Sequence, residues 1–241
     1  GRGEVLKSFE SVPLLTSEGA DSGYELGPMT FTPEPERVET VLSNGILEIL
    51  GRDGADRISV ERTSAGFLRV TGGATTSVDD GAGRFDLDRV SRVVVEAGPG
   101  EDHVTLSGDW HDAPVEVRGG AGRDELRASG VSRGGVTLQG GPGNDIMVGS
   151  PGNDNLVSIL GQDDVSGRAG RDRLETQGSQ VEVGGGLFTR RGVTSQMTGI
   201  EAARVAGTPD ADILDASAFD GSARLRGMAG PDTLIGGPRA D

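Results

Sequence analysis

The sequence predicts an all-β fold in which short strands stack in parallel as the coils of a solenoid, and three observations predict it. Glycine accounts for 42 of the 241 residues, whereas aromatic residues make up only 3%. Glycine and aspartate recur together at regular intervals, and short runs of alternating apolar and polar residues separate them. This composition favours a thin core of stacked Val, Ile and Leu over a globular core of aromatic side chains.

A nine-residue period runs through residues 140–175. The repeating unit is Gly-x-Asp-x-Φ, where Φ is an apolar residue two positions after the aspartate. Its members are Gly143, Gly152, Gly161 and Gly170, then Asp145, Asp154, Asp163 and Asp172, then Met147, Leu156, Val165 and Leu174. Each unit is too short to bury its own apolar face, so the period predicts coils that stack on one another.

The same unit recurs at wider spacing outside this run. Its aspartates are Asp56, Asp102, Asp124, Asp212 and Asp232. Intervals of 20 to 22 residues separate several of them, and we interpret the longer intervals, 46 before Asp102 and 40 before Asp212, as about two coils each. A coil of about 18 to 23 residues would then account for the chain from residue 46 onward.

The segments between the glycine-rich units are typical of strands. In 115–118, Val115 and Val117 alternate with Glu116 and Arg118, which places the two valines on one face. Residues 1–44 differ, because they contain four prolines and no complete Gly-x-Asp-x-Φ unit. We therefore expect 1–44 to be an N-terminal cap, arm or linker, and 45–241 to be the solenoid.

Charge and composition exclude several classes of function. Lys and Arg total 23 against 38 Asp and Glu, which gives a net charge of −15 at pH 7. This excess of acid argues against binding nucleic acid or an anionic membrane surface. The chain has no cysteine and no apolar run of 18 residues, so thiolate metal sites and a membrane span are not expected.

The glycine–aspartate turns suit calcium, which takes six to eight oxygen ligands from carboxylates, carbonyls and water. Glycine lets the chain curl until its carbonyl groups converge, and aspartate adds a short charged arm. One turn supplies too few ligands, whereas two turns stacked one coil apart can enclose an ion. With two nine-residue units per coil, Asp145 would stack with Asp163 on one edge, and Asp154 with Asp172 on the other.

These considerations define a set of candidate calcium ligands. The aspartates are Asp56, Asp102, Asp124, Asp145, Asp154, Asp163, Asp172, Asp212 and Asp232. The turn residues are Gly100, Gly120, Gly122, Gly141, Gly143, Asn144, Gly152, Asn153, Gly161 and Gly170. We expect several Ca²⁺ ions.

The sequence of residues 140–148 resembles the hemolysin-type calcium-binding repeat of the RTX family, Gly-Gly-x-Gly-x-Asp-x-U-x with U large and apolar. The resemblance is densest over 97–175 and 207–241. It implies a right-handed parallel β-helix or β-roll and a secreted, extracellular bacterial protein of the cell surface or matrix. Three units depart from the pattern. The one at Asp163 lacks the first glycine pair, Asp56 follows Gly51-Arg52-Asp53-Gly54, and Asp210 replaces a turn glycine before Asp212. Sites there are expected to be weaker or empty.

Two hypotheses of function follow. The first is a non-enzymatic structural or adhesive module, with head-to-tail self-assembly into filaments or a lattice as an added hypothesis. The alternative is a module that acts on extracellular polysaccharide by binding, lyase or epimerase activity. Catalysis would need a base beside carboxylates, and the chain offers one Lys, one Tyr and two His (His103 and His111).

Overall fold

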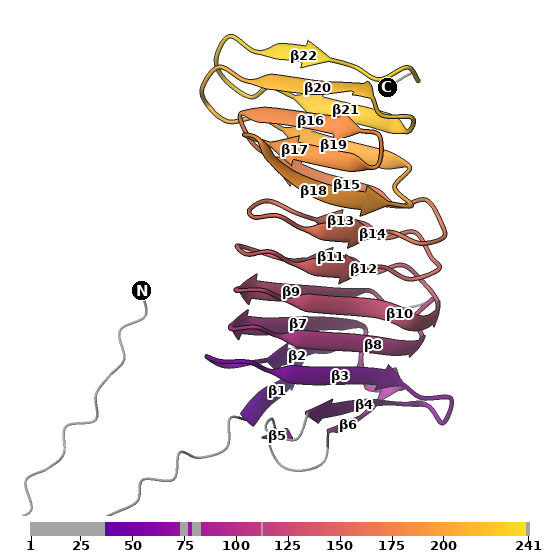
Figure 1. Cartoon of the computed structure of the whole chain (residues 1–241). Helices are drawn as coiled ribbons and strands as arrows, with labels where there is room; N and C mark the ends of the chain where they lie inside the picture. The colour runs from indigo at the N-terminus through magenta and orange to yellow at the C-terminus, as the bar shows by residue number, and fades with distance from the viewer. Residues whose placement is uncertain (1–36, 73–76, 79–82, 112, 240–241) are drawn as a thin grey trace, which may run out of the picture. The chain divides into compact units, whose positions relative to one another are not determined.

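The computed structural model describes residues 37–72, 77–78, 83–111 and 113–239. They belong to one compact unit that starts at Pro35. Within these residues the strands form two sheets, and the two sheets face each other across a narrow core (Figure 1). No helix in the described ranges is long and apolar enough to cross a membrane.

The first sheet has ten described strands: β1 (Arg37–Ser43), β2 (Ile46–Leu50), β5 (Ser77–Val78), β7 (Arg92–Pro99), β9 (Val115–Ala121), β11 (Thr137–Gln139), β13 (Asn155–Val157), β15 (Arg173–Gln177), β19 (Ala202–Ala206) and β21 (Ser222–Arg226). The second has twelve described strands: β3 (Arg57–Arg62), β4 (Phe67–Gly72), β6 (Arg84–Asp86), β8 (His103–Asp109), β10 (Glu125–Arg133), β12 (Ile146–Val148), β14 (Asp164–Ser166), β16 (Gln180–Gly184), β17 (Leu187–Arg190), β18 (Val193–Thr198), β20 (Ile213–Ala218) and β22 (Thr233–Ile235). One short 3₁₀ helix, η2 (Leu87–Arg89), precedes β7.

Parallel pairing between successive coils confirms the predicted solenoid. In the twelve-stranded sheet Leu126 pairs with Val104 of the preceding coil and with Met147 of the following one. Met147 in turn pairs with Val165. The apolar residue of each repeat therefore stacks on its equivalent, and all four side chains are buried. This stacked column forms one wall of the core, as expected from period-two alternation.

The two long intervals do not represent two coils each, so that prediction was wrong. β3 pairs directly with β8 in parallel, and Ile58 lies opposite Val104. The extra residues form an antiparallel excursion in which β4 pairs with β3 and β6 pairs with β4. The second interval joins different sheets, because Asp172 precedes β15 and Asp212 precedes β20. Between them the antiparallel strands β16, β17 and β18 are inserted into the twelve-stranded sheet.

The N-terminal end of the described chain lies in a hairpin. β1 pairs antiparallel with β2 through a turn at Asn44 and Gly45, both of which have positive φ. The expected boundary after residue 44 therefore falls at this turn, and β1 lies in the ten-stranded sheet. The cap, arm or linker predicted for 1–44 otherwise lies outside the described residues.

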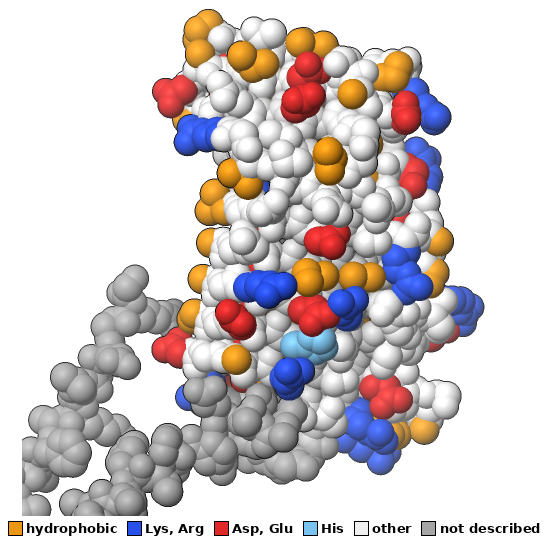
Figure 2. All heavy atoms as spheres, in the orientation of Figure 1, with side chains coloured by type: hydrophobic (Ala, Val, Ile, Leu, Met, Phe, Trp, Pro, Cys, Tyr) orange, Lys and Arg blue, Asp and Glu red, His pale blue; other side chains and the backbone are white. Residues whose placement is uncertain are grey.

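Charged side chains cover the outer faces of the strands. Arg118 Nη1 lies 2.5 Å from Glu96 Oε1, and Arg92 Nη2 lies 2.5 Å from Glu116 Oε2. Basic and acidic side chains also lie beside each other on the face shown in Figure 2. Each of these ion pairs joins neighbouring coils, but exposed pairs contribute only about 0–1 kcal/mol each. The buried turns therefore contribute more than these ion pairs to holding neighbouring coils together.

Candidate metal centres in the stacked turns

The repeat aspartates stack in two columns, one on each edge of the solenoid. The first column precedes strands of the twelve-stranded sheet and contains Asp56, Asp102, Asp124, Asp145 and Asp163. The second column precedes strands of the ten-stranded sheet and contains Asp154 and Asp172. The structure thus places the 18-residue pairs on the two edges that their spacing predicts.

A backbone-to-carboxylate hydrogen bond connects each aspartate with the next in its column. The Asp124 N–H donates to Asp145 Oδ1 at 2.9 Å, and the Asp145 N–H donates to Asp163 Oδ1 at 2.9 Å. In the second column the Asp154 N–H donates to Asp172 Oδ1 at 2.8 Å. Each of these acceptor carboxylates therefore has one oxygen committed to the neighbouring coil.

Sequence reasoning missed the residues that end the two columns. The Asp163 N–H donates to Ser195 Oγ at 2.9 Å, and the Asp172 N–H donates to Glu201 Oε2 at 2.8 Å. No local motif marks Ser195. Glu201 lies in Gly199-Ile200-Glu201, where glutamate takes the aspartate position of the Gly-x-Asp unit, and this spacing is the signal that could have found it. A third, shorter stack joins the Asp212 N–H to Asp232 Oδ1 at 3.1 Å.

The first glycine of the repeat lies directly beside its carboxylate. A Cβ at Gly119 would overlap Asp124 Oδ2, and one at Gly140 would overlap Asp145 Oδ2. Gly167 has the same relation to Asp172. Absence of a side chain therefore lets the carboxylate fold back against the turn backbone.

The glycine two residues before the aspartate allows neighbouring turns to stack closely. Gly122 has φ +137°, and a Cβ there would overlap the carbonyl oxygen of Gly100 in the preceding coil. Gly143 and Gly161 repeat this arrangement over Gly122 and Gly143. The turn backbones thus pack against one another, which brings the carbonyl groups of consecutive coils together.

Three carboxylates have a buried oxygen without a donor. Oδ2 of Asp124, Asp145 and Asp172 is buried and has no hydrogen-bond partner among the described residues. Burial, reinforced by the neighbouring Asp163 and Asp124 carboxylates, raises the pKa of Asp145 to about 7. Burial also raises the pKa of Asp172 to about 6 and that of Asp124 above its usual value. A buried carboxylate of this kind is costly unless a cation compensates it.

Carbonyl oxygens of the next coil lie beside two of these carboxylates, those of Asp124 and Asp172. The position that a Cβ of Gly119 would take lies 2.7 Å from Gly140 O and overlaps Asp124 Oδ2. A Cβ at Gly167 would likewise overlap both Gly199 O and Asp172 Oδ2. Carboxylate and carbonyl oxygens are the hard ligands that calcium prefers, so the residues present fit this ion.

Side chains alone do not build a site. Within the described ranges, no group of three or more His, Cys, Asp or Glu side chains could hold a metal ion. Any calcium site in these turns therefore depends on backbone carbonyl groups in addition to one or two aspartates. Asn144 and Asn153 have a different contact, because their Oδ1 atoms accept the N–H groups of Gln162 and Arg171 one coil later. If Asn144 and Asn153 bind calcium as predicted, their backbone carbonyl groups would be the ligands.

Two carboxylates each receive a backbone donor and a hydroxyl donor from one residue of their own turn. Ser150 donates its N–H to Asp154 Oδ2 at 2.6 Å and its hydroxyl to Asp154 Oδ1 at 2.8 Å. Thr208 donates to Asp212 in the same way, at 2.6 and 2.9 Å. Ser150 and Thr208 stand at the position of the second glycine of the repeat, and a hydroxyl residue there is a sequence signal that separates these turns from the others.

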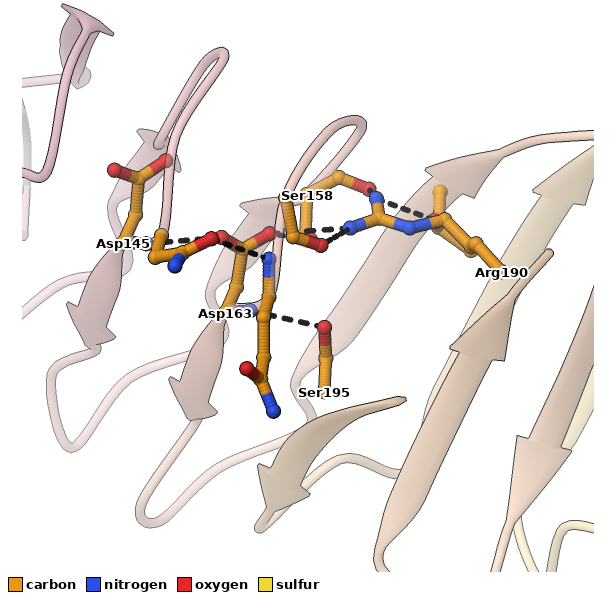
Figure 3. Close-up of polar contacts among 9 residues, drawn as sticks. Asp145, Ser158, Asp163, Arg190 and Ser195 are labelled. Carbon is orange, nitrogen blue, oxygen red and sulfur yellow. Dashed lines mark hydrogen bonds and ion pairs between the residues drawn. The ribbon is translucent and has the colours of Figure 1, made fainter. Parts of the chain in front are cut away.

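The Asp163 turn differs from every other turn described above, because a guanidinium reaches it (Figure 3). Arg190 Nη2 lies 3.3 Å from Asp163 Oδ2, and the Ser158 hydroxyl also donates to that oxygen. The Arg190 side chain is only 7% exposed. Burial lowers the pKa of Arg190, and the Asp163 carboxylate opposes this shift.

The fold and the turns define the class of protein: a parallel β-solenoid whose coils are joined by turns with paired carboxylate and carbonyl oxygens. Residues 132–156, 139–174 and 217–238 match the RTX calcium-binding nonapeptide repeat family, with four copies of the repeat. No curated protein matches the chain as a relative. The chain therefore carries RTX repeats, which bind calcium ions, and the several copies imply several Ca²⁺ sites. These repeats indicate a calcium-binding structural module of bacterial proteins.

Proposed function

We propose that the chain is a secreted bacterial surface or matrix module whose solenoid is completed by calcium in its stacked turns. The observation that carries this proposal is the buried Oδ2 atom without a donor at Asp124, Asp145 and Asp172. At Asp124 and Asp172 the fold positions these oxygens beside carbonyl groups of the next coil, and a divalent cation would compensate the charge of all three carboxylates. RTX repeats occur in secreted bacterial proteins, which supports an extracellular location.

Calcium then acts as a folding switch. Without the ion, the stacked carboxylates of the first column are buried close to one another and destabilise the coils that contain them. Extracellular modules bind calcium with Kd values of about 10⁻⁴–10⁻³ M, so millimolar calcium outside the cell would saturate them. Binding free energy becomes folding free energy when the unfolded chain has no site.

Circular dichroism and thermal melting in calcium and in chelator test this proposal. We expect a β-sheet spectrum and a high Tm at millimolar calcium, and a weaker β-sheet spectrum with a much lower Tm in chelator. Magnesium at the same concentration is the control, because it demands octahedral geometry at shorter distances and should not substitute. The same spectrum and Tm in calcium and in chelator would contradict the proposal.

Head-to-tail association is a second candidate function, favoured by the C-terminal end of the described solenoid. The described strand β22 lies at the edge of its sheet, and its Leu234 and Ile235 are 47% and 40% exposed. Met228 is 53% exposed nearby in sequence. An exposed apolar edge strand is a template for pairing with another chain. Light scattering at varied protein and calcium concentration tests this, and a strict monomer at high concentration would count against it.

The polysaccharide alternative predicts binding or turnover of an acidic glycan. RTX repeats are generally non-catalytic structural domains. The two histidines are each paired with a carboxylate, His103 with Glu125 and His111 with Asp109, both at 2.7 Å. Release of unsaturated sugar ends would indicate a lyase, whereas retention on a glycan array without turnover would indicate a binding module.

A further inference from the structure

Arg190 is a buried cation that the repeat pattern does not include. It is the last residue of β17, in the antiparallel insertion, and its side chain reaches across to the last aspartate turn of the first column (Figure 3). Its Nη1 donates to Ser158 O at 2.6 Å, and its Nη2 donates to Gly161 O at 2.7 Å. Nη2 also lies 3.3 Å from Asp163 Oδ2.

These three acceptors are equivalent to the oxygens around Asp145 one coil earlier. Ser158 and Gly161 lie five and two residues before Asp163, as Gly140 and Gly143 lie before Asp145. At Asp145 the carboxylate Oδ2 is buried without a donor, whereas at Asp163 the matching oxygen contacts a guanidinium and a hydroxyl. The carbonyl and carboxylate oxygens that suit calcium at one turn are therefore committed to Arg190 at the next.

A calcium ion does not fit beside this guanidinium. Both are cations, and they would compete for the same oxygens in a buried site where repulsion is poorly screened. Arg190 cannot easily leave, because it also lies 3.3 Å from Thr176 Oγ1 and its Cζ lies 5.2 Å from the centre of the buried Phe188 ring. The guanidinium supplies a fixed positive charge with several donors.

We propose that Arg190 is a tethered cation that takes the place of calcium at the Asp163 turn. The calcium-binding part of the first column then ends at Asp145, and the predicted ligands Asp163 and Gly161 bind the guanidinium instead. The inserted strands β16 to β18 are anchored to the solenoid by this contact without metal. This inference rests on the proposed calcium binding at the other turns.

Counting bound calcium in Arg190 variants tests the inference. Native mass spectrometry and equilibrium dialysis at saturating calcium measure ions per chain. Arg190→Met keeps the aliphatic volume but removes the donors and charge, so we expect one additional ion per chain. Arg190→Lys is the matched control, because it keeps the charge, and we expect the wild-type number. A folded Arg190→Met variant with the wild-type number of ions would overturn the inference.

Hydrogen exchange on the wild-type chain gives a second readout if Arg190→Met fails to fold. Removing calcium should speed exchange in 140–148 at least tenfold and change exchange in 158–164 less than twofold. An equal response of the two segments would overturn the tethered cation while leaving calcium binding intact. No response in either segment would overturn the proposed calcium function, and this inference with it.

Discussion

Replacing Asp145 with asparagine should affect stability in opposite directions with and without calcium. The asparagine side chain would keep an Oδ1 acceptor for the Asp124 N–H but would remove the negative charge at Oδ2. In the calcium-free chain that charge is a cost, because burial raises the pKa of Asp145 to about 7 from 3.8. In the calcium-bound chain the same charge is a ligand.

The size of the calcium-free effect follows from the pKa shift. A rise of about three pH units, at about 1.4 kcal/mol per unit, corresponds to roughly 4 kcal/mol at pH 8. An asparagine NH₂ without an acceptor at the Oδ2 position would destabilise the variant by about 1–3 kcal/mol and offset part of this gain. We therefore expect Asp145→Asn to be about 1–3 kcal/mol more stable than the wild type in chelator. At calcium concentrations about 1,000 times Kd, loss of one site costs about 4.1 kcal/mol, so the variant becomes less stable than the wild type by about 1–3 kcal/mol.

Urea unfolding at pH 8, followed by circular dichroism in chelator and in calcium, measures both differences. Asp154→Asn is the matched control, because Asp154 accepts from the N–H and hydroxyl of Ser150 and an amide would oppose those donors. The control should be destabilised under both conditions. If Asp145→Asn is less stable than the wild type in chelator as well, the reasoning about its buried, uncompensated charge is refuted.

Three further perturbations test other parts of the account. The raised pKa values of Asp145 and Asp172 favour the protonated folded state, so the stability of the calcium-free chain should fall as pH rises from about 4 to about 7. The fall should reach up to about 1.4 kcal/mol per pH unit for each group. Urea unfolding across this pH range measures the change, and a stability that rises with pH would contradict the prediction. Calcium affinity should rise over the same range, since binding displaces protons, which calorimetry in two buffers detects. Gly140→Ala should remove the part of the calcium-dependent stabilisation that comes from the Asp145 turn, because its Cβ would overlap Asp145 Oδ2. Gly178→Ala, where the atom nearest to the added Cβ is Val181 Cγ2 at 3.2 Å, should retain all of it in melting experiments. Leu156→Ala, in the buried core, should cost about 2–5 kcal/mol in calcium by urea unfolding, and a loss below about 1 kcal/mol would argue against tight stacking there.

The periodic part of the fold could be predicted because every coil repeats the same local physics. The positions of the glycine, the aspartate and the following apolar residue predict the turn, its carboxylate and the core side chain, respectively. The stacking of Asp145 with Asp163, 18 residues later, is observed. Asp102 and Asp124, which precede Asp145 at successive intervals of 22 and 21 residues, continue the same edge in the structure. Local signals sufficed wherever one coil is stacked on a similar one.

The insertions could not be predicted from the intervals alone. A 46-residue interval equals about two coils in length, yet Asp56 and Asp102 are in contact through a 2.7 Å hydrogen bond. Whether extra residues form a new coil or an antiparallel excursion depends on tertiary pairing, which a motif does not encode. Arg190 illustrates the same limit, since it lies 27 residues beyond Asp163 and outside any repeat.

A diffraction experiment on calcium-grown crystals, with anomalous difference maps that locate calcium, tests the central claim most directly. We predict calcium density beside Oδ2 of Asp124, Asp145 and Asp172, with turn carbonyls as further ligands. At Asp163 we predict the guanidinium of Arg190 in place of an ion. Maps without calcium density at those three turns, from a chain that is folded as described, would contradict it.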